Sequence, residues 1–324
     1  MLQRLKSVGL AVVFVLGATL AHAQEKVIYL FPAPDFLPAF APFQLAKSKG
    51  YYKAEGLDVE FQVGKGGADV AKQVAVGNAD LGGGIGDTPL IVRANGLTVK
   101  GVALLGGQSL TAIYVRKDAG VKSLADLKGK NVGVLAFQDT TYYNFLAALA
   151  SVGLTKDDVS IQAVGPAGVV QLMIAGSVQA ISGVPEWAAA IEAANVPLDR
   201  YGIDQVFPAM AQAILASDKA IKERPKAVKG FVTATLKAVV EIMADPEKAS
   251  KEYVAAVPQH AGKEKAMEAI MRRYTEQVYA PAKGLKLGQF DADRMAKVQK
   301  FYLDSKIVEI AVPVAETFSN EFIN

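Results

Sequence analysis

Short apolar runs and helical patterns alternate along this chain in two successive series, and this order limits the folds open to it. The first series has apolar runs typical of strands at 27–31, 57–63, 81–85, 99–105 and 110–115. Helical patterns separate several of these runs, at 38–50, 66–76 and 88–94. Strands that alternate with helices usually form a parallel sheet with helices on its faces, so we expect an α/β fold.

The second series begins after Lys117 and repeats the same order. Its predicted strands and helices lie at 131–137, 141–152, 159–164, 169–175, 178–182 and 185–194. Residues 76–83 and 175–183 also resemble one another, because each has a helix end, a glycine, a polar turn and a strand of small residues. The repetition predicts two similar lobes, each with a mostly parallel sheet flanked by helices.

Beyond a predicted strand at 211–217 the chain is almost wholly helical. The helical patterns lie at 219–243, 246–257, 263–278 and 291–305. We expect lobe one to comprise residues 24–115 and 211–324, including this helical C-terminal extension, and lobe two to comprise residues 116–210. The chain would cross between the lobes near Arg116 and near Met210, and the two crossings would form a hinge.

Residues 1–23 have the three parts of a secretory signal peptide. A basic start precedes an apolar run at 8–20, and Ala21-His22-Ala23 ends it with a small-x-small sequence. The run is too short for a comfortable membrane span, and a buried N-terminal helix is disfavoured because no helix cap precedes it. We therefore expect a mature periplasmic protein that begins near Gln24.

The composition excludes several kinds of chemistry. The chain has no Cys, which excludes disulfides, thiolate catalysis, thiolate metal sites and a lipid-anchored N-terminal cysteine. Of its two His, His22 lies in the predicted leader, and His260 alone cannot build a Ser-His-Asp triad or a multi-histidine metal site. The net charge of +3 argues against a nucleic-acid partner. We expect no catalytic residues, no metal and no cofactor.

Ligands of open α/β sheets bind beyond the carboxyl ends of the strands, where helix N-termini present free N–H groups. Polar and aromatic residues follow several predicted strands at this position. The predicted ligand-binding residues are Asp35, Phe36, Gly67, Ala68, Asp87, Thr88, Gln138, Thr140, Thr141, Tyr142, Glu186 and Trp187. An alternative stays open for some of them, because Asp87, Thr88 and Thr140 also suit helix caps and Trp187 suits a core.

Four segments resemble a known family of proteins. They are LAKSKGYYKAEGLDV at 45–59, AVGNAD at 75–80, SLADLKGKNVGV at 123–134, and LASD at 215–218 followed by ERP at 223–225. These segments resemble motifs of the periplasmic ABC-importer substrate-binding proteins of the nitrate/alkanesulfonate/taurine and thiamine-pyrimidine-precursor-binding family. The similarity extends over roughly residues 27–256.

The resemblance implies a two-lobed, type II periplasmic binding protein fold and a monomer that delivers a small solute to the membrane subunits of an ABC importer. An enzyme on the same fold, acting on a pyrimidine-like or small organic substrate, is the alternative. The pyrimidine-synthase relatives carry a cysteine-rich motif and an active-site histidine, whereas this chain has no Cys and its His260 lies in the helical tail.

The charges at the predicted site favour one class of solute. Helix N-termini suit a sulfonate, nitrate or carboxylate. Acidic residues near these positions would repel a multiply charged anion, and no Lys or Arg stands among them. The sequence therefore favours an amino-substituted or heteroaromatic solute, with Phe36, Tyr142 or Trp187 stacking on it.

The leader gives a direct prediction about processing. Cleavage after Ala23 should leave an exported protein whose N-terminal sequence begins at Gln24 or within a residue or two of it. Edman sequencing of protein from the periplasmic fraction measures this. Recovery of the full-length chain from the cytoplasm would contradict both the leader and the predicted location.

Overall fold

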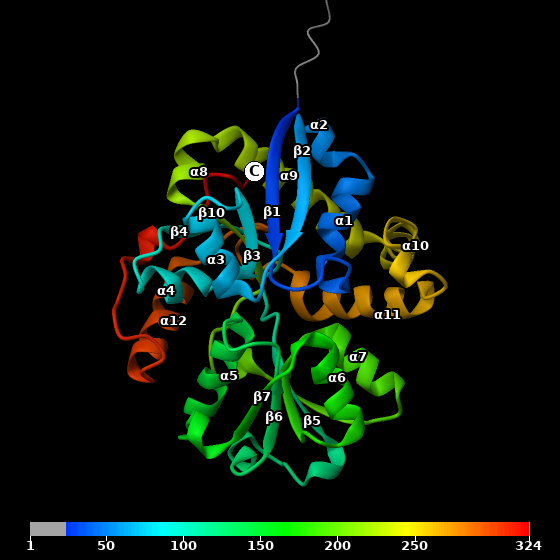
Figure 1. Cartoon of the computed structure of the whole chain (residues 1–324), viewed down its shortest axis with the longest axis vertical. Coiled ribbons are helices and arrows are strands. Elements are labelled where there is room, and N and C mark those ends of the chain that lie inside the picture. Colours follow the sequence, from blue (N-terminus) through cyan, green and yellow to red (C-terminus); the bar gives the residue numbers. More distant parts are fainter. Residues whose placement is uncertain (1–23, 324) are drawn as a thin grey trace, which may run out of the picture.

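Two five-stranded sheets form the centres of the two lobes (Figure 1). The computed structural model describes residues 24–323, so the predicted signal peptide lies outside the described residues. The first sheet has the order β2-β1-β3-β10-β4, with bounds Leu57–Val63, Glu25–Phe31, Leu81–Ile85, Gln212–Ser217 and Val99–Leu104. The second has the order β7-β6-β8-β5-β9, with bounds Ser160–Ala163, Asn131–Val134, Ala180–Gly183, Ala112–Arg116 and Leu198–Gly202.

The two sheets have the same topology. In each, the first three strands of the order run parallel, and the fourth strand is antiparallel to both of its neighbours. The antiparallel strands are β10 and β5, and β3 and β8 hold the same third position. The sequence similarity between 76–83 and 175–183 therefore reflects equivalent places in the two lobes, and the expected fold class is confirmed.

Helices cover both faces of each sheet and extend the chain beyond it (Figure 1). Lobe one has the helices α1 Ala41–Ser48, α2 Tyr51–Ala54, α3 Gly67–Ala75 and α4 Thr88–Arg93. Lobe two has α5 Thr140–Ala150, α6 Gly165–Ala175 and α7 Pro185–Ala193. The C-terminal helices are α8 Asp218–Glu223, α9 Pro225–Ala244, α10 Pro246–Ala256, α11 Glu264–Tyr274 and α12 Ala292–Asp304. Short helical turns lie at Pro38–Phe40, Lys117–Ala119, Leu124–Leu127, Lys156–Asp158, Ile203–Gln205, Pro258–His260, Thr275–Tyr279 and Val314–Glu316.

The structure differs from the expected elements in three places. The helix predicted at 219–243 is divided at Arg224, because the proline ring of Pro225 disfavours a helical residue before it. Strand β9 was not expected, since its sequence LDRYG is polar, as suits an edge strand. Strand β5 pairs with β8 and β9, so the first crossing lies before Ala112 and not near Arg116.

A stack of aromatic rings fills the core of lobe one. The ring of Tyr29 on β1 stacks on Phe43 at 4.7 Å and on Phe231 at 5.0 Å between centroids. Phe231 in turn stacks on Tyr52 at 4.8 Å. The four residues come from β1, α1, α2 and α9, so the stack binds the early and late parts of the chain into one lobe.

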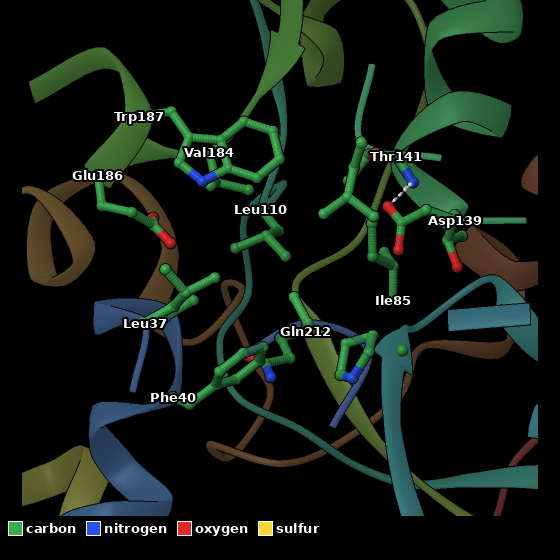
Figure 2. A pocket seen from close by; sticks show the side chains of 16 residues that line it. Leu37, Phe40, Ile85, Leu110, Asp139, Thr141, Val184, Glu186, Trp187 and Gln212 are labelled. Carbon is green, nitrogen blue, oxygen red and sulfur yellow. Dashed lines mark hydrogen bonds between the residues drawn. The ribbon is translucent and has the colours of Figure 1, made fainter. Parts of the chain in front are cut away.

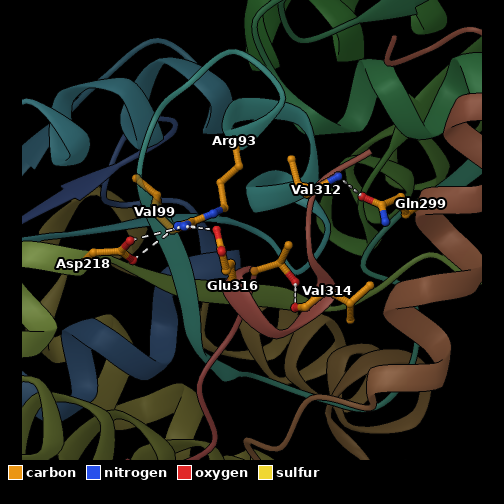
Figure 3. Close-up of polar contacts among 8 residues, drawn as sticks. Arg93, Val99, Asp218, Gln299, Val312, Val314 and Glu316 are labelled. Atoms are coloured by element: carbon orange, nitrogen blue, oxygen red, sulfur yellow. Dashed lines mark hydrogen bonds and ion pairs between the residues drawn. The ribbon is translucent and has the colours of Figure 1, made fainter. Parts of the chain in front are cut away.

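The C-terminal segment is fastened to lobe one by an ion-pair cluster (Figure 3). The Arg93 guanidinium donates to Asp218 at 3.2 Å and to Glu316 at 2.9 Å. The backbone N–H of Val312 donates to the side chain of Gln299 on α12 at 2.8 Å. Phe318 forms a parallel bridge with Gly101 on β4. These contacts hold the C-terminal segment against the first sheet and its helices.

Arg294 on α12 connects the two crossings between the lobes. Its guanidinium donates from Nη1 to the carbonyl of Gly107 at 2.6 Å, in the first crossing. It also donates from Nε to the carbonyl of Pro208 at 3.2 Å and from Nη2 to that of Ala209, in the second. The two interlobe crossings thus lie side by side, and the Arg294 side chain bonds to both.

None of the helices between residues 24 and 323 has the length and apolar character that spanning a membrane requires.

Two buried tyrosines of the lobe-one core form a matched pair for a stability test. The Tyr29 hydroxyl is buried and has no hydrogen-bond partner among the described residues, whereas the Tyr52 hydroxyl bonds to Thr235 Oγ1 at 2.9 Å. Because an unpaired buried hydroxyl carries only its desolvation cost, Tyr29→Phe should leave the free energy of unfolding unchanged or raise it. Tyr52→Phe should lower it by about 1 kcal/mol. Urea unfolding followed by circular dichroism measures both free energies. A greater loss of stability in Tyr29→Phe than in Tyr52→Phe would contradict the finding that the Tyr29 hydroxyl has no partner among the described residues.

Candidate functional site

A small cavity lies where the carboxyl ends of the strands of both lobes face one another (Figure 2). Its volume is about 50 Å³. Lobe one contributes Pro32, Ala33, Leu37, Ala39, Phe40, Gly84 and Ile85; lobe two contributes Leu135, Asp139, Thr140, Thr141, Val184, Glu186 and Trp187; Leu110 and Gln212 come from the crossing regions. Figure 2 shows Glu186 and Trp187 opposite Asp139 and Thr141, with Gln212 and Phe40 closing one end.

Four buried polar atoms in this wall lack a hydrogen-bond partner among the described residues. They are Thr141 Oγ1, Glu186 Oε1, Trp187 Nε1 and Gln212 Nε2. The four residues are only 4–5% exposed. Leaving a buried polar atom unpaired costs about 1–3 kcal/mol, and most buried polar atoms in folded proteins are paired. Four such atoms in one cavity are expected of a binding site in which the ligand supplies the missing hydrogen bonds.

Glu186 enters the cavity from the first turn of α7. The Tyr274 hydroxyl on α11 donates to Glu186 Oε2, which leaves Oε1 directed at the cavity. Burial raises the pKa of the Glu186 carboxyl to about 7, against the smaller lowering effect of the Tyr274 hydrogen bond. The next residue, Trp187, packs against Gly183, where a Cβ would lie 3.2 Å from the indole. Glycine at this position therefore makes room for the ring.

Several predicted site residues join the two lobes instead of lining the cavity. The N–H of Gly67 donates to Asp139 Oδ2 at 3.1 Å, and the N–H of Ala68 donates to the carbonyl of Gln138 at 3.0 Å. The hydroxyls of Thr88 and Thr140 are 2.8 Å apart. The helix N-termini of α3 and α5 are thus bonded to the opposite lobe, and of these residues Asp139 and Thr140 also line the cavity.

Asp87 lies in a fully buried polar cluster behind the cavity. Asn144 on α5 donates to Asp87 Oδ2 at 2.7 Å, and the Tyr302 hydroxyl on α12 donates to the same oxygen. Asn144 Oδ1 accepts from the hydroxyl of Thr111 at 3.0 Å. Burial raises the pKa of the Asp87 carboxyl, while these hydrogen bonds lower it. Asp87 therefore contacts lobe two and the tail and lies outside the cavity wall.

The remaining predicted residues lie farther from the cavity. Asp35 accepts a hydrogen bond from Gln44, the side chain of Gln138 is exposed, and Tyr142 packs against Phe137 with ring centroids 5.2 Å apart. Phe36 lines a neighbouring groove. His260 lies in the C-terminal tail, as expected, and it also lines this groove, where its Nε2 lies 2.6 Å from the Phe36 carbonyl oxygen.

This outer groove is larger than the cavity and shares three lining residues with it. Its volume is about 890 Å³, and residues of α6 and α7 of lobe two and of α11 of the tail line it. Figure 1 shows these three helices close to one another at the boundary of the two lobes. Leu37, Glu186 and Trp187 line both spaces. The groove wall is mainly apolar, and Arg273 in it is paired with Glu192.

Sequence reasoning missed much of the cavity wall. Gln212 is the first residue of β10 and follows the second crossing, so no helix N-terminus marked it. Leu37 and Phe40 lie in a helical turn that carries no polar motif. The segment 31–36 after β1 did signal this region. Within residues 24–323, no group of three or more His, Asp or Glu side chains is placed to hold a metal ion.

Comparisons with known proteins identify relatives of both binding and synthase type. Residues 37–249 match a family model described as NMT1/THI5 like. The riboflavin-binding protein RibY of Chloroflexus aurantiacus is 25% identical over 95% of this chain and 89% of its own length. The 4-amino-5-hydroxymethyl-2-methylpyrimidine phosphate synthase THI13 of Saccharomyces cerevisiae is 27% identical over 72% of each chain.

Solved structures share the fold. The alkanesulfonate-binding protein SsuA from Xanthomonas axonopodis pv. citri, bound to MOPS, superposes with a TM-score of 0.70, covering 92% of this chain and 98% of SsuA. At 20% identity this similarity establishes the architecture of periplasmic binding proteins and leaves the ligand open.

The raised pKa of Glu186 predicts a pH-dependent stability. In the unfolded chain the carboxyl ionises near its ordinary value of 4.5, whereas in the folded protein it ionises near 7. As pH rises from 4.5 to 7 the unfolded state releases this proton first, so folding loses stability in that window, by up to about 3 kcal/mol. Relative to Glu186→Gln, the wild type should be less stable at pH 8 than at pH 4 by this amount.

Urea unfolding of both proteins across this pH range measures the difference. The buried carboxyls of Asp87 and Asp139, whose pKa values burial also raises, are common to both proteins and cancel. Parallel pH profiles for the wild type and Glu186→Gln would contradict the assignment.

Proposed function

This chain belongs to the NMT1/THI5-like family, and we propose that it is an extracytoplasmic solute-binding protein that delivers a small organic solute to an ABC importer. The observation that carries the proposal is the set of four polar atoms, without partners among the described residues, in one small cavity between the lobes. A solute that paired with them would recover their desolvation cost, and it would do so only when both lobes and the crossing region surround it.

The four atoms favour a particular class of solute. Trp187 Nε1 and Gln212 Nε2 are hydrogen-bond donors, Glu186 Oε1 is an acceptor when ionised, and the Thr141 hydroxyl serves as either. A group with an acceptor and a donor side by side, such as an amide or the edge of an amino-substituted heterocycle, pairs with all of them. Among residues 24–323, no Lys or Arg lines this cavity, so nothing there offsets the charge of a sulfonate or nitrate beside Glu186.

The mechanism follows from the two crossings. The lobes would open and close about the paired segments under Arg294, and the solute would be enclosed when they close. The interlobe bonds at Gly67 and Thr88 would then form, and the membrane subunits of the importer would recognise the closed shape. This role needs no metal, no cofactor and no catalytic residue, and we propose that the protein fulfils it as a monomer.

An enzyme of the synthase type is the second candidate, because relatives with that name match 72% of the chain. The discriminating measurement is native mass spectrometry of the exported protein purified from its own cells. A solute that is retained and chemically unchanged on incubation supports the binding role, whereas any turnover contradicts it. Riboflavin, the ligand in the name of the RibY relative, is the first compound to titrate against the emptied protein.

Two buried threonines separate a binding role from a packing role. Thr141→Val removes a hydroxyl whose remaining interaction within the described residues is with the nearby Asp139 carboxylate, so stability should fall little, while affinity for the recovered solute should weaken by about 1–3 kcal/mol. Thr235→Val is the control, because Thr235 donates to the Phe231 carbonyl at 2.8 Å in the core of lobe one. It should lower stability and leave affinity unchanged.

Calorimetric titration and thermal unfolding of both variants measure these effects. A Thr141→Val variant that binds like the wild type but unfolds at a lower temperature would contradict the proposed site.

A further inference from the structure

We propose that the site is bipartite and that its ligand is elongated, with a compact hydrogen-bonding head in the inner cavity and an apolar body in the outer groove. The proposal rests on the proposed function and specifies the shape and chemistry of the solute. The observations that carry it are the sizes of the two spaces, the residues they share, and the side chains of the groove.

The inner cavity is too small for a complete aromatic solute. Its volume is about 50 Å³. A buried apolar cavity that admits benzene measures about 150 Å³ by comparison. With the lobes in contact, only a group of a few heavy atoms fits among Thr141, Glu186 and Gln212. The rest of any ring-bearing solute must lie outside it.

The outer groove begins where the inner cavity ends. Leu37, Glu186 and Trp187 line both spaces, so the two adjoin at these side chains. In the proposed site, a molecule bonded to the polar atoms inside extends past the Trp187 indole into the groove. The groove volume of about 890 Å³ lies within the range of roughly 300–1,000 Å³ that small-molecule sites occupy. The head and the body therefore have adjoining places in one site.

The groove walls suit an apolar body. Alanines face it from both sides, with Ala190 on α7 and Ala269 on α11 both exposed. Phe36, Val170 and Ile270 add larger apolar surfaces. The charges present are those of Glu186 at the junction, the Arg273–Glu192 pair and the exposed Lys263, with His260 hydrogen-bonded to Phe36. An alkyl or aromatic extension would bury these apolar side chains and its own surface together.

A series of 4-alkylbenzamides tests the proposal, because the carboxamide supplies an acceptor and a donor for the head and the alkyl chain lengthens the body. Calorimetric titration of the emptied wild-type protein should give a Kd that falls about two- to fourfold for each added methylene, up to 4-hexylbenzamide. Ala190→Leu and Ala269→Leu should fill the groove. They should weaken the binding of 4-hexylbenzamide at least tenfold more than that of benzamide, because the hexyl chain reaches farther along the groove than the ring.

Ala296→Leu is the matched control, since Ala296 is exposed on α12 and does not line the groove. It should bind every compound like the wild type. Equal wild-type affinity along the series, or unchanged affinity for 4-hexylbenzamide in the two groove variants, would overturn the bipartite site and leave the solute-binding role standing. If the wild type binds none of the amides and retains no solute from its own cells, the proposed function fails as well.

Discussion

The guanidinium of Arg294 is the contact on which the arrangement of the two lobes depends. It donates to the carbonyls of Gly107 in one crossing and of Pro208 and Ala209 in the other. The fixed fork of an arginine holds such acceptors at a defined spacing. Leu110 and Gln212 follow directly from these crossings and line the cavity. The side chain of Arg294, which belongs to the C-terminal tail, therefore fixes the two crossings and with them the places of Leu110 and Gln212 in the cavity wall.

The interlobe contacts and the cavity have different roles when the lobes close. Gly67, Ala68 and Thr88 are bonded to lobe two, so the amides and hydroxyl at these helix starts already have partners when the lobes meet. Within the described part of the cavity wall, the buried side-chain atoms without a partner belong to Thr141, Glu186, Trp187 and Gln212. Helix N-termini thus contribute to closure, while side chains supply the polar groups that a solute must satisfy. This division favours a solute recognised by hydrogen-bond pattern over one recognised by negative charge.

Much of the fold was predictable from the sequence, because hydrophobic periodicity and glycine stops report local structure. The strands at 57–63 and 81–85 were predicted with the bounds that the structure has. The strand β9 was not predicted, since a polar edge strand has no apolar signal. The first crossing lies before Ala112 and not near Arg116, where it was predicted, because tertiary contacts decide which strands pair. At the site, Glu186 and Trp187 were found from their helix start, whereas Gln212 depends on a crossing geometry that no local pattern records.

The place of β10 in the first sheet has a consequence for the order of folding. Strands β3 and β4 are not neighbours, because β10 lies between them and pairs with both. Residues 112–202, by contrast, contain every strand of the second sheet in one continuous stretch. When the chain is made from its N-terminus, β3 can pair only with β1, and β4 has no strand partner in this sheet until residues 212–217 follow. Loop closure over more than a hundred residues makes that pairing slow, so the second lobe completes its sheet before the first.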